Sequence, residues 1–103
     1  MKTRREMLEE FVAHDPSDSF SRYALALELE KDGRAQHAVP QLKEVIVRDP
    51  GYVAAYQQLG RLLAQTGMIQ EARDAYNRGI EIAAASGDQR AGSEMREALE
   101  MLE

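Results

Sequence analysis

The stretch QLGRLLAQTGMIQEARDAYNRGI, residues 58–80, repeats the pattern of ALALELEKDGRAQHAVPQLKEVI, residues 24–46, without a gap. Large apolar residues fall on large ones, and small residues fall on small ones. Self-similarity at one fixed interval is the signature of a repeat protein, so we expect stacked copies of one structural unit. The pairs that keep an interval of 34 residues include Leu25 and Leu59, Gly33 and Gly67, Ala38 and Ala72, and Ile46 and Ile80.

Each unit predicts two helices joined by a glycine turn. In the first unit Leu25 and Leu29 belong to an apolar stripe with helical spacing, and a second stripe begins at Ala38. Gly33 separates the two stripes, and glycine readily adopts the positive φ that ends a helix. We therefore expect antiparallel helical hairpins. Their first helices are predicted over residues 18–32 and 52–66.

Pro40 falls inside the predicted second helix of the first hairpin. It aligns with Asp74 and lies well past the turn at Gly33. Near the fourth helical position a proline forfeits at most one backbone hydrogen bond, and the carbonyl that it crowds lies at the very end of the helix. The pattern predicts one continuous helix over residues 36–48 with a loosened first turn.

The two units carry a motif of large and small residues that resembles the tetratricopeptide repeat (TPR) family over residues 19–86. The second unit reads Tyr56-x2-Leu59-Gly60-x2-Leu63, then Ala72-x3-Tyr76. The first unit reads Arg22-x2-Leu25-Ala26-x2-Leu29, then Ala38-x3-Leu42, then Pro50. Arg22 departs from the family pattern because it puts a charge where a buried aromatic residue is expected. The resemblance implies an all-α fold, a right-handed superhelical stack of antiparallel helix hairpins.

The flanking segments are expected to add one helix at each end of the stack. Leu8 lies 34 positions before Leu42, which puts the N-terminal segment in the register of a second helix. The C-terminal segment has an apolar face and a charged face, as a terminal capping helix requires. We expect a single TPR-like domain, 1–103, with about six helices. Its predicted parts are an N-terminal capping helix (1–15), repeat 1 (19–52), repeat 2 (53–86) and a C-terminal capping helix (87–103).

Composition limits the possible classes of function. The chain has 103 residues, a formal net charge of −5 and no cysteine, so disulfides and thiolate sites are excluded. The negative charge argues against a nucleic-acid surface. The basic N-terminal start turns acidic before an apolar run develops, and no apolar run approaches the length of a membrane span. We expect a cytoplasmic protein with no nucleic-acid or membrane partner.

No residue pattern in the sequence predicts catalysis, a metal site or a cofactor. His14 and His37 are the only histidines, and neither has a partner at metal-ligand spacing. Glu9 and Glu10 fit an exposed helix face better than an acid–base pair. The sequence contains no phosphate loop, dinucleotide fingerprint or nucleophile elbow. We therefore expect a protein that is not an enzyme.

The TPR resemblance implies a concave wall built from the first helix of each hairpin. Phe20, Tyr23 and Leu27 form a second apolar stripe on the first of these helices. Three interpretations of this stripe remain open: a wall that accepts a peptide, a surface packed beneath the N-terminal helix, or a homodimer interface. The residues predicted to bind a peptide are Phe20, Tyr23, Leu27, Lys31, Ala54, Gln57 and Arg61.

The expected function is therefore that of a protein- or peptide-binding adaptor or scaffold. Arg61 beside Gln57 would offer a charged and amide-bearing contact to an acidic or backbone group of the partner. The alternative is a self-associating structural module, in which the stripe Phe20, Tyr23 and Leu27 closes a weak homodimer. A fold-level resemblance does not name the partner.

Overall fold

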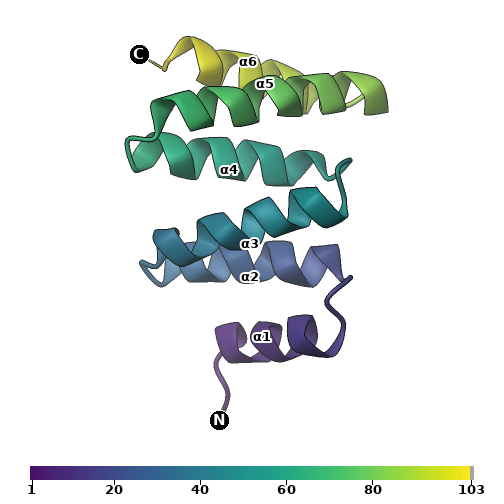
Figure 1. Cartoon of the computed structure of the whole chain (residues 1–103), viewed down its shortest axis with the longest axis vertical. Helices are drawn as coiled ribbons and strands as arrows, with labels where there is room; N and C mark the ends of the chain where they lie inside the picture. The colour runs from purple at the N-terminus through teal and green to yellow at the C-terminus, as the bar shows by residue number, and fades with distance from the viewer. Residues whose placement is uncertain (103) are drawn as a thin grey trace. The chain divides into compact units, whose positions relative to one another are not determined.

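The computed structural model describes residues 1–102, and every regular element in this range is an α-helix (Figure 1). The predicted helices are all present, with ends that differ by a few residues from those expected. The helices are α1 (Arg4–His14), α2 (Ser19–Lys31), α3 (Ala35–Arg48), α4 (Val53–Gln65), α5 (Ile69–Ser86) and α6 (Gln89–Glu100).

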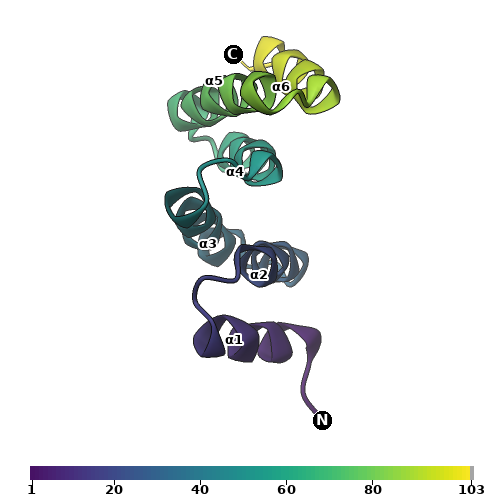
Figure 2. The same cartoon turned by 90° about the vertical axis from the view of Figure 1, so that its right-hand side faces the viewer.

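Contacts divide the chain into two compact units, Met1–Asp49 and the part that begins at Pro50. In the first unit α2 lies between α1 and α3 and packs against both (Figures 1 and 2). In the second unit α5 packs against α4 and α6, and α4 also contacts α6. Each unit thus contains one helical hairpin, α2–α3 or α4–α5, together with one flanking helix.

The turns inside the two hairpins are built alike. Gly33 and Gly67 have φ angles of +77° and +82°, a conformation that side chains disfavour. At the first turn the Arg34 amide donates to the Leu29 carbonyl at 2.8 Å, and at the second the Met68 amide donates to the Leu63 carbonyl at 2.8 Å. These bonds satisfy carbonyls at the helix end in the Schellman arrangement. The two glycines, 34 residues apart, therefore form equivalent turns in the two hairpins.

Helix α3 runs through Pro40 without interruption, as predicted, and begins at Ala35. Its N-cap, Arg34, makes no side-chain capping bond. The Arg34 carbonyl accepts hydrogen bonds from the amides of His37 (3.0 Å) and Ala38 (3.1 Å). The first turn therefore combines a 3₁₀-type bond, to the third residue along, with an α-helical bond, to the fourth. The proline deprives only the Gln36 carbonyl of its helical donor, because that bond would run from position 40 to position 36.

Apolar side chains fill the interfaces within each unit. Tyr56 and Leu42 are among the largest side chains that are fully buried. The core of the first unit contains Leu8, Ala24, Leu25, Ala26, Leu29, Ala38, Leu42 and Val45. The core of the second unit contains Ala55, Tyr56, Leu59, Leu62, Leu63, Ala72, Ala75, Tyr76, Ala83, Ala91 and Met95.

Two glycines allow the helices of the second unit to approach closely. A Cβ atom at Gly60 would lie 2.6 Å from Cε1 of Tyr76, so the tyrosine ring of α5 occupies the space beside α4. A Cβ atom at Gly79 would lie 2.5 Å from Sδ of Met95 and 2.7 Å from Cβ of Tyr56. Such distances are far shorter than van der Waals contact. Helix α5 therefore meets α4 and α6 at points where no side chain fits.

Candidate functional site

The predicted site residues of the first unit lie along one side of α2. The side chain of Phe20 is 69% exposed, Tyr23 and Leu27 are half-buried, and Lys31 is exposed. The other side of the helix carries Leu25 and its neighbours, which are buried in the core. Because Phe20 lies mostly in solvent, it does not pack beneath α1. Phe20 is thus exposed at the surface of this unit, whereas most of the surface of Tyr23 and Leu27 is covered.

Ion pairs link α1 to the C-terminal end of α2, and Lys31, the last residue of α2, takes part in one pair within its own helix. The carboxylate of Glu28 lies 3.5 Å from Nε of Arg4 and 3.9 Å from Nζ of Lys31. Asp32 lies 3.4 Å from Nε of Arg5. Glu28 is nearly buried whereas Lys31 is exposed, so the lysine remains at the surface with part of its charge balanced.

Two of the predicted site residues of the second unit lie beside α6. Ala54 and Gln57 line a small hollow of about 220 Å³, which residues of α6 complete. The amide Nε2 of Gln57 donates to Oε1 of Glu94 at 3.1 Å, and Nε of Arg90 donates to Oε2 at 3.3 Å. Sequence reasoning missed Arg90 and Glu94 as companions of Gln57. The charged face of the predicted C-terminal helix, which carries both residues, was the feature of the sequence that could have indicated them.

Arg61, the third predicted site residue of this unit, hydrogen-bonds to Gln58 on its own helix. Its guanidinium donates from both Nε (3.0 Å) and Nη2 (2.5 Å) to Oε1 of Gln58. Burial raises the pKa of Tyr76, and the positive charge of Arg61 opposes part of that rise. The structure therefore brings Ala54 and Gln57 to the α6 hollow, whereas the Arg61 guanidinium is held by Gln58.

Gln57 is expected to control the titration of Glu94. The hydrogen bond from Gln57, and then that from Arg90, hold the pKa of the Glu94 carboxyl below its ordinary value. Gln57→Ala should therefore raise this pKa, which carboxyl NMR titration measures. Since the folded-state pKa is depressed, the stability that this interaction contributes is present above the unfolded-state pKa and is lost as the pH falls through the folded-state pKa.

Gln58→Ala provides the matched control for this titration, because Gln58 bonds Arg61 on the same helix. The Glu94 titration should be unchanged in this variant. Equal pKa values of Glu94 in the wild type and in Gln57→Ala would show that the Gln57 bond does not act on the carboxylate.

The departure of Arg22 from the family motif is explained by its hydrogen bonds. Nη1 of Arg22 donates to Oε1 of Gln41 at 3.0 Å, and Nη2 donates to the Pro16 carbonyl at 3.1 Å. At the same position of the second repeat, the Tyr56 hydroxyl donates to the Pro50 carbonyl at 2.5 Å. The arginine therefore reproduces the bond of the tyrosine. Its Nε, however, is buried without a hydrogen-bond partner.

Arg22→Tyr is expected to stabilise the protein by about 1–2 kcal/mol, because replacing a buried charge by a well-packed neutral group is often favourable. The new hydroxyl could donate to the Pro16 carbonyl as Tyr56 does to Pro50. Urea unfolding followed by circular dichroism measures the change. Arg22→Met, which has a similar stem and no donor, should be less stable than Arg22→Tyr. A variant Arg22→Tyr that is less stable than the wild type would show that the Gln41 bond outweighs the cost of the buried charge.

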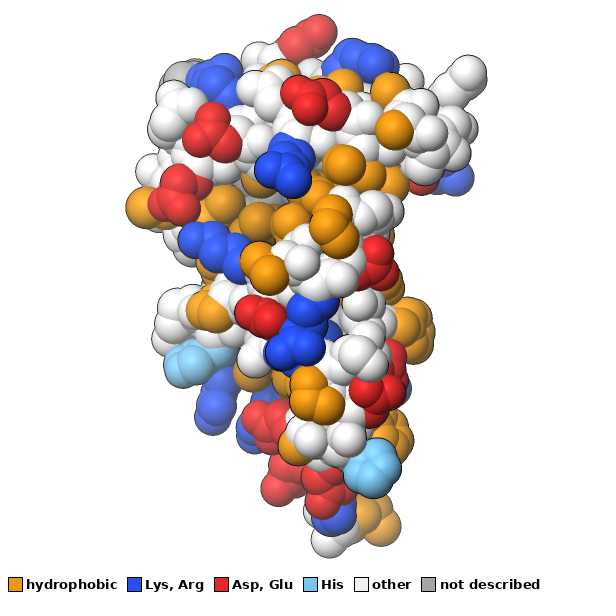
Figure 3. All heavy atoms as spheres, turned by 45° about the vertical axis from the view of Figure 1, so that its right-hand side comes forward, with side chains coloured by type: hydrophobic (Ala, Val, Ile, Leu, Met, Phe, Trp, Pro, Cys, Tyr) orange, Lys and Arg blue, Asp and Glu red, His pale blue; other side chains and the backbone are white. Residues whose placement is uncertain are grey.

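The described surface is charged with both signs. On the face drawn in Figure 3, basic and acidic side chains are interspersed, and both histidines (pale blue) are exposed. Within residues 1–102, no group of three or more histidine, cysteine, aspartate or glutamate side chains is arranged to hold a metal ion. Over the same range, none of the helices combines the length and the apolar character that crossing a bilayer demands.

The sequence of this chain is similar to those of proteins of known family. The family model described as "Tetratricopeptide repeat" matches residues 29–102, well over half of the chain. A TPR repeat-containing protein of Pseudomonas aeruginosa is 31% identical over 90 residues, which cover 87% of this chain and 86% of that protein. The solution structure of a tetratricopeptide repeat domain protein from Salinibacter ruber has a TM-score of 0.78 at 40% identity and covers 82% of this chain and 86% of that chain.

A more distant protein has the same fold. The type III secretion translocator chaperone SycD of Yersinia enterocolitica has a TM-score of 0.87 at 18% identity, over 93% of this chain and 67% of that chain. At this identity the likeness concerns the fold alone. From the family match and the relative in Pseudomonas, the chain belongs to the tetratricopeptide repeat family and has its all-α helical repeat fold.

Proposed function

We propose that this protein is a non-enzymatic adaptor or scaffold that binds a protein or peptide partner. The TPR fold generally serves as a protein-interaction module. The single observation that carries the proposal is the surface of α2. Phe20 is 69% exposed and is followed at helical spacing by the half-buried Tyr23 and Leu27, although the opposite side of the helix is fully packed. Aromatic and apolar side chains at a surface are typical of binding sites.

The α2 stripe is suited to apolar side chains of the partner. Most of the surface of Tyr23 and Leu27 is already covered, so their rotamers are restricted before binding and less conformational entropy is lost. Lys31, one turn further along, offers a cation at the end of the stripe. An apolar segment that carries an acidic group therefore fits this helix face.

In the second unit the proposed contacts are polar. Gln57 already donates to Glu94, and a partner carbonyl could accept from the second hydrogen of the Gln57 amide. Ala54 is half-buried beside it and permits the partner backbone to approach. Arg61 is half-buried and adds a cation one turn along α4.

A comparison of variants tests the α2 stripe. The variant Tyr23→Ala/Leu27→Ala should lose the partners that the wild type captures from the native lysate, whereas Val47→Ala should retain them. Val47 is a matched control because it is apolar, 72% exposed and located on α3 of the same unit. Capture of the same partners by the double variant would exclude the stripe as the binding surface.

Light scattering coupled to gel filtration separates binding from self-association. A monomeric wild type at high micromolar concentration is the expected result. A dimer that Tyr23→Ala/Leu27→Ala converts to monomer would instead support a homodimer interface formed by the same stripe, and would contradict the adaptor proposal for that surface.

A further inference from the structure

Helix α1 exposes an apolar stripe that the repeat register leads one to expect in a core. Phe11 lies 34 positions before Val45, which is 0% exposed in α3, yet the Phe11 side chain is 56% exposed. Met7, one turn earlier on the same side of α1, is 42% exposed. Leu8, on the neighbouring side, is 6% exposed because it faces α2. Helix α1 therefore has an inner apolar side, which α2 covers, and an outer one.

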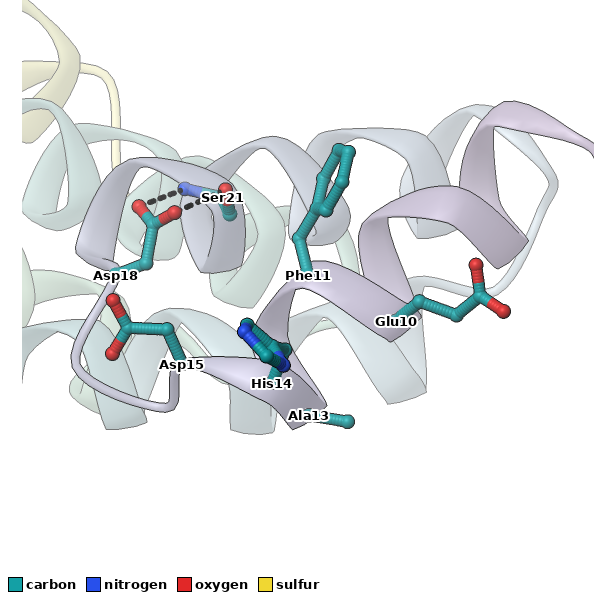
Figure 4. Close-up of a pocket in the computed structure, with 7 residues that line it drawn as sticks. All are labelled: Glu10, Phe11, Ala13, His14, Asp15, Asp18 and Ser21. Carbon is teal, nitrogen blue, oxygen red and sulfur yellow. Dashed lines mark hydrogen bonds between the residues drawn. The ribbon is translucent and has the colours of Figure 1, made fainter.

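A hollow lies beside Phe11, between the C-terminal half of α1 and the start of α2. Its volume is about 880 Å³, as large as many ligand pockets of proteins. Figure 4 shows Phe11 rising from α1, with Asp15 and Asp18 on one side of it and Glu10 on the other. The apolar centre of this surface is thus flanked by carboxylates.

Each of the two aspartates accepts two hydrogen bonds from a serine. Asp18 accepts from the amide (3.0 Å) and the hydroxyl (2.6 Å) of Ser21. Asp15 accepts from the amide (3.1 Å) and the hydroxyl (2.6 Å) of Ser17. These donors are neutral, and within residues 1–102 no ion pair neutralises either aspartate. The bonds from Ser21 also hold the pKa of the Asp18 carboxyl below its ordinary value.

Glu10 already has a cation nearby, since Lys2 pairs with it. Both side chains are more than half exposed, so this pair is weak and can exchange with a cation of a partner. Asp15 and Asp18 are therefore the main source of the negative potential beside Phe11.

Charge decides which kind of occupant fits this surface. A second copy of the chain would bring the same carboxylates against Glu10, Asp15 and Asp18, and each copy carries a formal net charge of −5. Like charges brought together at an interface oppose association. A partner with lysine or arginine beside its apolar residues would instead be attracted by the same carboxylates, and these charges would favour association.

The spacing of the exposed residues favours a helical partner. Met7 and Phe11 are four residues apart and form a ridge along α1, and ridges of this kind pack into the grooves of a second helix. We propose that the hollow between α1 and the start of α2 docks a basic amphipathic helix of a partner protein, with apolar side chains on Phe11 and cationic ones beside Asp15 and Asp18. The residues that line this hollow do not include Phe20, Tyr23 or Leu27 of the α2 stripe.

Two synthetic peptides test the proposal on the full chain. Both have about 16 residues, enough to span α1 at 1.5 Å per residue. They share leucine and alanine on one helix face and carry either lysine or glutamate on the other. In an NMR titration the lysine peptide should bind at least about tenfold more tightly and should shift the amides of Phe11, His14 and Ser21. Equal affinity for both peptides, or no binding of either at millimolar concentration, would overturn the proposal.

Variants locate the site and separate it from the α2 stripe. Phe11→Ala should weaken binding of the lysine peptide roughly tenfold, as truncation of a central aromatic contact does. Met68→Ala, which removes another exposed apolar side chain, should leave the affinity unchanged. The variant Tyr23→Ala/Leu27→Ala should also retain the peptide, so this experiment can fail independently of the proposed function. An unchanged affinity in Phe11→Ala would exclude the site.

The role of charge is tested at the two aspartates. Asp15→Asn/Asp18→Asn removes both charges, and asparagine at position 18 still caps α2. Affinity for the lysine peptide should fall severalfold in this variant and should fall with added salt in the wild type. An affinity that responds to neither change would overturn the choice of a basic partner. Self-association that Phe11→Ala abolishes, measured by sedimentation equilibrium, would assign the hollow to a second copy and overturn the proposal.

Discussion

Tyr56→Ala is expected to lower the free energy of unfolding by about 3–5 kcal/mol, the usual cost of truncating a fully buried aromatic side chain. Tyr56 is 1% exposed and is among the largest side chains that are completely buried. Its Cβ would lie 2.7 Å from a Cβ at position 79, which places the tyrosine at a close approach of α4 and α5. The midpoint of thermal unfolding, followed by circular dichroism, should fall by at least about 15 °C.

Tyr56→Phe separates the ring from its hydroxyl. This variant removes only the bond to the Pro50 carbonyl, and the expected cost is about 1 kcal/mol. The larger loss in Tyr56→Ala would then come from the cavity left by the ring. Equal destabilisation by the two substitutions would show that the hydrogen bond, and not the packing of the ring, carries the stability.

Gly79→Ala is expected to destabilise the second unit by about 1–3 kcal/mol, the usual cost of overpacking a core. The added methyl would lie 2.5 Å from Sδ of Met95 and 2.7 Å from Cβ of Tyr56. Met95 can change rotamer, but Cβ of Tyr56 is bonded to the backbone of α4 and moves only with the helix. The intrinsic preference of alanine for helices, about 1 kcal/mol over glycine, offsets part of this cost. Urea unfolding measures the net change.

Gly92→Ala is the matched control, because it makes the same substitution within a helix of the same unit. A Cβ atom at this position would lie 3.8 Å from Cβ of Ala83, an ordinary contact. The variant should be more stable than the wild type by about 0.5–1 kcal/mol. Stabilisation in both variants would indicate that helix propensity, and not the close approach at Gly79, governs the result.

The repeat interval was sufficient to predict the helices and their turns. Gly33 and Gly67 end α2 and α4 because helix termination depends on a local backbone conformation. Pro40 was predicted to lie within a helix for an equally local reason, since the bond that it forfeits belongs to the first turns of the same helix. Features that depend on a few consecutive residues can be inferred from those residues.

The candidate site could be predicted only in part. The helical spacing of Phe20, Tyr23 and Leu27 places them on one side of α2, but their exposure depends on which helices pack nearby. The bond from Gln57 to Glu94 joins residues that are far apart in the sequence. No local pattern encodes this pairing, because it arises from the packing of α6 against α4 and α5.

Phe11 and Val45 show where the sequence reaches its limit. The sequence by itself determined that both positions are apolar, helical and in the same register. Only the tertiary structure decided that Val45 is completely buried and that Phe11 is 56% exposed. The physical reason is that burial depends on atoms contributed by other helices, whereas periodicity depends only on the order of residues along one helix. The same reason applies to Arg22, whose bonds to Gln41 and Pro16 make a charge tolerable at an aromatic position.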